Sequence, residues 1–109
     1  MLTLSRFLTF SGLVLFSFSA MAAEEFSLNI KEHKFAPAEI HVPANQKFKL
    51  NITNEDATPE EFESHDLNRE KTISAHSKAT LFLGPLKPGT YTFSGEFNPK
   101  TAQGSIIAK

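Results

Sequence analysis

Apolar and polar residues alternate along several short stretches of the chain. Phe26, Leu28 and Ile30 alternate with polar residues, and similar strand-like stretches occur at 40–42, 48–52, 79–83, 91–93 and 105–108. A period of two residues is typical of a strand with one face toward a core. Turn residues separate these stretches, a weaker element covers 62–73, and no segment keeps a helical period. The pattern predicts an all-β sandwich or barrel of about seven strands with little helix.

The first 22 residues have the composition of a signal peptide. Arg6 supplies a positive charge, residues 7–18 form a mainly apolar run, and Ala20-Met21-Ala22 matches an A-x-A cleavage site. The run is shorter than the roughly 20 apolar residues that cross a bilayer. We therefore expect residues 1–22 to be a signal peptide and residues 23–109 to form one exported domain without a membrane span.

Charge and cysteine content narrow the range of functions. Removal of residues 1–22 takes away Arg6 and no acidic residue, so the formal net charge changes from −1 to −2. No stretch concentrates Lys and Arg, so nucleic acid is not an expected partner. The chain has no cysteine and no Gly-x-Ser-x-Gly motif, so nucleophilic catalysis has little support.

Three segments resemble a cupredoxin domain in their order and spacing. They are Phe35-Ala36-Pro37, the loop 54–59, and residues 88–93 leading to Gly104-Ser105-Ile106. The resemblance implies a Greek-key β-sandwich. The family's copper ligands correspond here to Glu60, Gly95 and Asn98, with Gln103 near the axial position. A type 1 blue site takes two imidazoles and a thiolate, so we expect no type 1 blue copper.

A narrower resemblance lies in Glu61-Phe62-Glu63-Ser64, Gly95-Glu96-Phe97 and Thr101-Ala102-Gln103-Gly104. These short sequences resemble the corresponding segments of cupredoxin-like proteins that accompany bacterial iron permease systems in the periplasm. That resemblance implies a periplasmic protein that binds a copper or iron ion through carboxylates and other non-blue ligands. It also implies that the partner is a membrane iron permease or another periplasmic component. A further implication is that the protein assists the oxidation of ferrous iron.

Acidic residues are dense after the third predicted strand. Glu61 and Glu63 are two positions apart, so a strand places them on one face while Phe62, like Phe93 in its own strand, points to the core. Paired carboxylates repel unless a cation or a proton lies between them. In the family, the loop that carries Glu96 lies beside this segment. We therefore predict a metal site formed by Glu61, Glu63 and Glu96 and completed by His65 or by His33, whose loop approaches the ligand end in related domains.

The same acidic residues also allow a metal-free interpretation. A run of charges often forms only a solvated loop, and Glu96 has Lys100 and Arg69 as possible ion-pair partners. The protein would then be a metal-free periplasmic interaction module, which uses acidic loops on a cupredoxin scaffold to dock a partner. Glu and His side chains gathered at one end of the fold would favour the metal site over the module.

Overall fold

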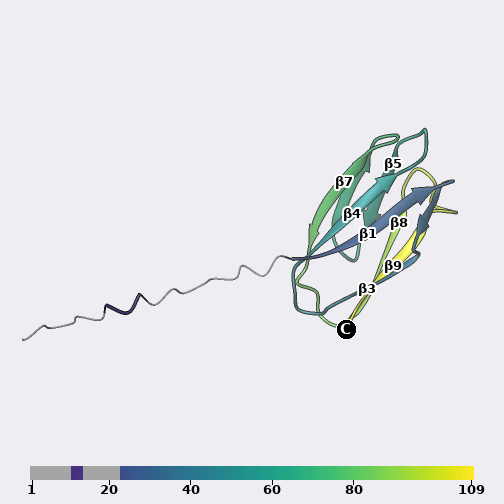
Figure 1. Ribbon diagram of the computed structural model, residues 1–109. Coiled ribbons are helices and arrows are strands. Elements are labelled where there is room, and N and C mark those ends of the chain that lie inside the picture. Colours follow the sequence, from purple (N-terminus) through teal and green to yellow (C-terminus); the bar gives the residue numbers. More distant parts are fainter. Residues whose placement is uncertain (1–10, 14–22) are drawn as a thin grey trace, which may run out of the picture.

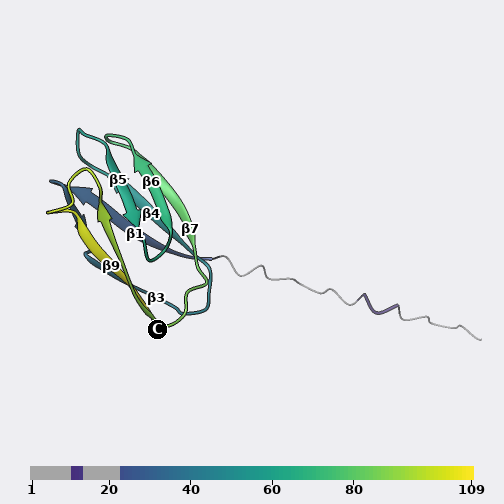
Figure 2. The same cartoon turned by 180° about the vertical axis from the view of Figure 1, so that it is seen from behind.

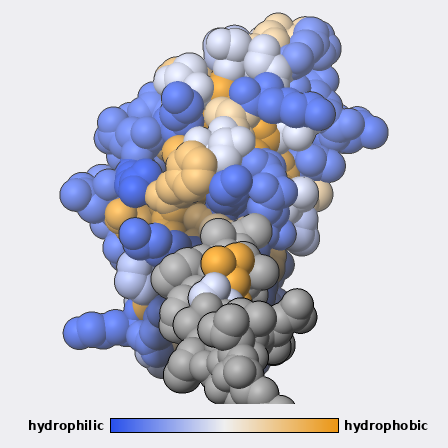
Figure 3. Space-filling model, turned by 60° about the vertical axis from the view of Figure 1, so that its left-hand side comes forward, coloured by the Kyte–Doolittle hydropathy of each residue, from blue (hydrophilic) through white to orange (hydrophobic). Residues whose placement is uncertain are grey.

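The computed structural model describes residues 11–13 and 23–109, so the signal peptide predicted for residues 1–22 lies outside the described residues apart from 11–13. In the described residues, nine strands form two sheets that pack face to face (Figures 1 and 2). Within the described residues, no helix has the length and apolar character needed to cross a membrane. On the face drawn in Figure 3, hydrophilic residues surround limited apolar areas.

The two sheets contain four and five strands. The first has the order β2 (Lys34–Ala36), β1 (Glu24–Lys31), β4 (Phe48–Asn54) and β7 (Lys78–Leu83). The second has the order β3 (Glu39–Val42), β9 (Gln103–Ala108), β8 (Gly89–Gly95), β5 (Glu60–Ser64) and β6 (Arg69–Ile73). The β1–β4 and β3–β9 pairs are parallel and the other pairs are antiparallel.

The all-β sandwich predicted from the sequence is confirmed, with nine strands within 23–109 in place of about seven. The weaker element at 62–73 is a hairpin of β5 and β6, whose second strand is an exposed edge rich in charged residues and therefore lacks apolar alternation. The other added strand, β2, has only three residues. It pairs with β1 across a two-residue turn in which Glu32 and His33 have φ values of 52° and 58°, a conformation suited to tight hairpins.

Aromatic side chains join the two sheets in the core. Phe35 of β2 packs against Phe93 of β8 with ring centroids 5.1 Å apart, and Phe93 packs against Phe62 of β5 at 5.0 Å. The prediction that Phe62 and Phe93 face the core is confirmed, since they are 0% and 4% exposed. Because side chains alternate along a strand, Glu61 and Glu63 face outward from the second sheet, whereas Glu60 faces inward with Phe62.

Candidate functional site

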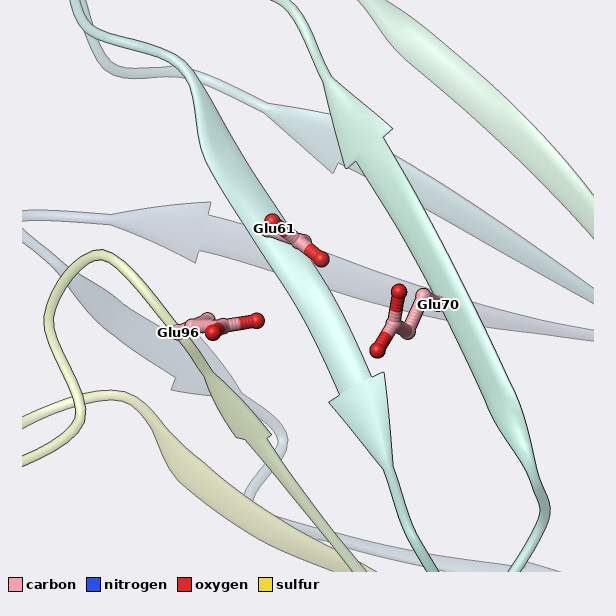
Figure 4. A group of neighbouring side chains, drawn as sticks. All are labelled: Glu61, Glu70 and Glu96. Carbon is pink, nitrogen blue, oxygen red and sulfur yellow. The ribbon is translucent and has the colours of Figure 1, made fainter.

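Three glutamates, Glu61, Glu70 and Glu96, form an outward cluster on the outer face of the second sheet, where β5 lies between β8 and β6, and Glu63 adjoins it. Glu63 of β5 lies directly opposite Glu70 of β6. On the other side of β5, the Glu96 N–H, just past the end of β8, donates to the Glu61 carbonyl at 2.8 Å. Carboxylate oxygens of Glu61, Glu70 and Glu96 all lie within 4.8 Å of one another. Figure 4 shows Glu96 extending toward Glu61 and Glu70.

Mutual repulsion and partial burial affect the protonation of this cluster. The pKa of Glu61 is raised, first by partial burial and then by the charge of Glu96 and a hydrogen bond with it. The pKa of Glu63 is raised mainly by a hydrogen bond with the Glu96 carboxyl group, and partial burial adds to the effect. Both groups therefore hold a proton more strongly than an isolated glutamate, which is the expected response of crowded carboxylates without a cation.

Arg69 and His65 line a surface hollow together with Glu63 and Glu70. His65 Nε2 lies 3.4 Å from a Glu63 carboxylate oxygen, and the His65 side chain is almost fully exposed. Among residues 11–13 and 23–109, no Lys or Arg lies within 4.0 Å of the carboxylates of Glu61, Glu63, Glu70 or Glu96. The ion pair of Glu96 with Lys100 or Arg69, which the metal-free interpretation allowed, is not present in this part of the chain.

The structure brings most of the predicted site residues together and leaves one apart. Glu61 and Glu96 share the cluster, and Glu63 and His65 adjoin it. His33 instead lies at the β1–β2 turn, where its Nδ1 is 3.6 Å from Asp56. The pKa of Asp56 is lowered, chiefly because the His33 N–H donates to its carboxylate. His33 therefore belongs to a second, separate contact.

Sequence reasoning missed Glu70. Its place opposite Glu63 follows from the β5–β6 hairpin, which the sequence showed only as a single weak element. A local signal was available, because His65-Asp66-Leu67-Asn68 contains turn-forming residues, and Asn68 adopts a positive φ of 52°. Recognition of that turn would have indicated two strands and an outward-facing Glu70.

A different arrangement fills the interior at the positions that correspond to copper ligands. Glu60 is 1% exposed. One of its carboxylate oxygens, Oε1, accepts the N–H groups of Glu61 and Phe97 at 3.0 and 2.9 Å, and the other, Oε2, accepts Asn98 Nδ2 at 2.8 Å. A buried carboxylate is costly unless hydrogen bonds satisfy it. No buried side-chain polar atom in the described residues lacks a partner, so this carboxylate is satisfied by amide donors.

Gly95 leaves the space that this carboxylate fills. A Cβ added at Gly95 would lie 2.6 Å from Glu60 Cδ and 2.6 Å from Ala102 Cβ. Gln103, near the axial position, uses its amide to donate to the Pro99 carbonyl at 3.0 Å. In place of thiolate and imidazole ligands, the chain therefore has the hydrogen-bonded carboxylate of Glu60, the glycine Gly95 and the amide of Gln103. These residues do not fit a type 1 copper ion.

Comparison with known proteins agrees with this fold. The family model for a cupredoxin-like domain matches residues 5–108. The chain belongs to the cupredoxin-like domain family. The chain is 51% identical over 83 residues to an uncharacterized protein of Rickettsia prowazekii (strain Madrid E). The match covers 76% of this chain and 66% of the Rickettsia protein, so the chain spans just under two thirds of that protein.

Solved structures similar to this cupredoxin-like domain include copper proteins. Auracyanin A, a blue copper protein from Chloroflexus aurantiacus, has a TM-score of 0.70 and 12% identity, over 81% of this chain and all of that one. The metal-binding domain of the Streptococcus pneumoniae Cu(I)-exporting ATPase CopA, solved with Cu(I), has a TM-score of 0.69 and 14% identity, over 78% of this chain and 84% of that one. At these identities the likeness concerns the fold. The cupredoxin resemblance is confirmed, and the narrower one to iron permease systems stays a prediction.

Proposed function

We propose that this cupredoxin-like domain is a periplasmic metal-binding accessory protein for iron or copper uptake. In this proposal the ion binds outside the sandwich, at Glu61, Glu70 and Glu96, and Glu63 and His65 complete its coordination. The main support is the convergence of three carboxylates within 4.8 Å without a Lys or Arg partner in the described residues. A cation there would relieve repulsion that the fold otherwise has to tolerate.

The ligand types and spacing suit a first-row transition metal. Carboxylate oxygens lie roughly 2.0 to 2.2 Å from a first-row metal such as zinc, so two oxygens on one ion lie up to about 4.4 Å apart. The three carboxylates, within 4.8 Å of one another, meet this limit with small side-chain adjustments. Carboxylate oxygens favour oxidised iron, and an imidazole such as that of His65 suits copper and iron. By holding Fe(III) more tightly than Fe(II), binding of this kind would assist the oxidation of ferrous iron by an external oxidant such as dioxygen, which accepts the electron, or would deliver the ion to a membrane permease.

Thermal unfolding of untagged protein, with and without added ion, tests the proposal. An ion at 100 times its dissociation constant stabilises the folded state by about 2.7 kcal/mol. For a domain of this size, each kcal/mol raises the Tm by roughly 4 to 8 °C. We expect Cu(II), or Mn(II) as a redox-stable substitute for Fe(II), to raise the Tm by about 10 °C or more at this saturation.

Two matched variants show whether the outward cluster is responsible. Glu96→Gln should remove most of the increase in Tm, because Glu96 contributes one of the three converging carboxylates. Glu39→Gln removes the same charge from β3, where Glu39 contacts His41 at 2.8 Å, and should leave the increase intact. Equal losses in both variants would mean that only general electrostatics is at work. No increase in the wild-type protein would contradict metal binding.

The interior arrangement favours a second candidate, a metal-free interaction module. Glu60 takes three hydrogen bonds from amide groups, so the scaffold does not need an ion to satisfy its buried polar groups. The acidic outward face would then dock a basic partner by charge complementarity. Protein purified from the periplasm would carry no stoichiometric metal in this case, whereas the metal-binding proposal predicts bound iron or copper.

A further inference from the structure

The buried carboxylate of Glu60 and the outward cluster lie on opposite faces of β5, and both are tied to the loop that follows β8. We infer that Glu60 is a positioning residue for the metal site, which rests on the metal-binding function proposed above. Its hydrogen bonds inside the sandwich hold this loop so that Glu96, outside, faces Glu61 and Glu70. The role needs no ion in the interior.

Glu60 holds the residues on both sides of Glu96. Gly95 lies against it so closely that an added Cβ would be 2.6 Å from Glu60 Cδ. The Phe97 N–H donates to Glu60 Oε1 at 2.9 Å. Between these two contacts, the Glu96 N–H donates to the Glu61 carbonyl at 2.8 Å. The backbone at Glu96 is therefore held by two hydrogen bonds to the start of β5, with Gly95 packed against the Glu60 side chain.

The next residue, Asn98, connects Glu60 to the shape of the whole loop. Its side-chain amide donates to Glu60 Oε2 at 2.8 Å. Its carbonyl accepts the N–H groups of Thr101 and Ala102 at 3.2 and 2.9 Å, and its own N–H donates to the Gly95 carbonyl at 3.1 Å. Loss of the Glu60 carboxylate would thus release the turn that carries Glu96, while the β5–β6 pairing that places Glu70 would remain.

Two substitutions separate the acceptor role of Glu60 from its charge. Glu60→Met keeps the length of the side chain but removes both acceptor oxygens, so Phe97 and Asn98 lose their partner. Glu60→Gln keeps one oxygen for the two backbone N–H groups, and its amide can donate to Asn98 once the Asn98 amide turns over. Ile52 is fully buried in β4, in the other sheet. Ile52→Ala therefore serves as a control that lowers the stability of the domain at a different place.

Amide hydrogen exchange of the metal-free protein reports on the loop directly. In Glu60→Met, exchange at Glu96 and Phe97 should rise about tenfold or more relative to amides of the β1–β4 pair. Glu60→Gln should stay within about threefold of the wild type. Ile52→Ala should not raise these two amides selectively. If Glu60→Met does not fold, Asn98→Ala removes one of the same bonds and should raise exchange in the same place.

Titration of the same variants with Cu(II) links the loop to the outward site. Glu60→Met should raise the dissociation constant for Cu(II) about tenfold or more. Glu60→Gln should keep it within about threefold of the wild-type value. Unchanged exchange at Glu96 and Phe97 in Glu60→Met would overturn the positioning role whether or not copper binds. Increased exchange with unchanged copper affinity would overturn its link to the metal site. If the wild-type protein binds neither copper nor another tested ion, that result would instead contradict the proposed function. The exchange data would still decide whether Glu60 positions Glu96.

Discussion

Gly95→Ala tests most sharply whether the Glu60 carboxylate occupies the interior beside β8. Gly95 is not among the residues with a positive φ, so its backbone conformation suits alanine. At a position with open space, the change would stabilise the protein by about 0.4 to 1 kcal/mol through the unfolded state. The sign of the effect therefore depends on what the new methyl group meets.

The structure predicts that the methyl group meets two fixed neighbours. The added Cβ would lie 2.6 Å from Glu60 Cδ and 2.6 Å from Ala102 Cβ, whereas carbon atoms pack at about 3.5 to 4.0 Å. The neighbours must move by about 1 Å, and such overpacking costs about 1 to 3 kcal/mol. A hydrogen bond of Glu60 that breaks in the process adds about 1 to 3 kcal/mol. We expect a total destabilisation of about 2 to 6 kcal/mol.

Urea denaturation followed by circular dichroism measures this cost. At roughly 4 to 8 °C per kcal/mol, the Tm should also fall by about 10 °C or more. Ser94→Ala, one position earlier on β8, is the matched control and should change stability by less than about 0.5 kcal/mol. In a Glu60→Ala background, one of the two clashing neighbours is gone, so Gly95→Ala should cost less than it does alone. A neutral or stabilising Gly95→Ala would refute the placement of Glu60.

Three further predictions concern copper, charge and pH. Cupric ion should give no intense blue thiolate-to-copper band in an optical spectrum, since the chain has no cysteine. Glu70→Gln should raise the Tm of the metal-free protein, because it removes a like charge opposite Glu63, and should reduce the increase in Tm that metal causes. The raised pKa values of Glu61 and Glu63 give stability that is complete at low pH and is lost as pH rises through the folded-state values. The lowered pKa of Asp56 gives stability that is lost as pH falls through its folded-state value. Urea denaturation at a series of pH values should therefore show a maximum of stability in mildly acidic solution. Stability should decline from there toward neutral pH, and Glu96→Gln should reduce that decline. A stability that rises steadily from acid to neutral pH would contradict the account of the cluster.

Local periodicity was sufficient to predict the direction of most side chains on β5. The alternation of Glu61, Phe62 and Glu63 placed the first and third outward and the second in the core, as observed. The same period puts Glu60 on the Phe62 face, so the signal for a buried carboxylate was present. The sequence nevertheless drew attention to Glu60 only as a residue at a copper-ligand position, and its burial was not predicted.

The partners of these residues depend on contacts between distant segments. Glu60 is satisfied by donors 37 and 38 positions away, on Phe97 and Asn98, and no local pattern encodes that pairing. Glu70 joins the cluster through the register of a hairpin with an exposed charged edge, which gives little hydrophobic signal. His33 was placed with the carboxylates by family resemblance, but the structure pairs it with Asp56.

An anomalous difference map from crystals soaked in Cu(II) tests most directly where this cupredoxin-like domain holds a metal. We predict a peak on the outward face of the second sheet, between the carboxylates of Glu61, Glu70 and Glu96, and none beside Glu60. A peak in the interior between Glu60 and Asn98 would contradict the account, and so would the absence of any peak at the outward cluster.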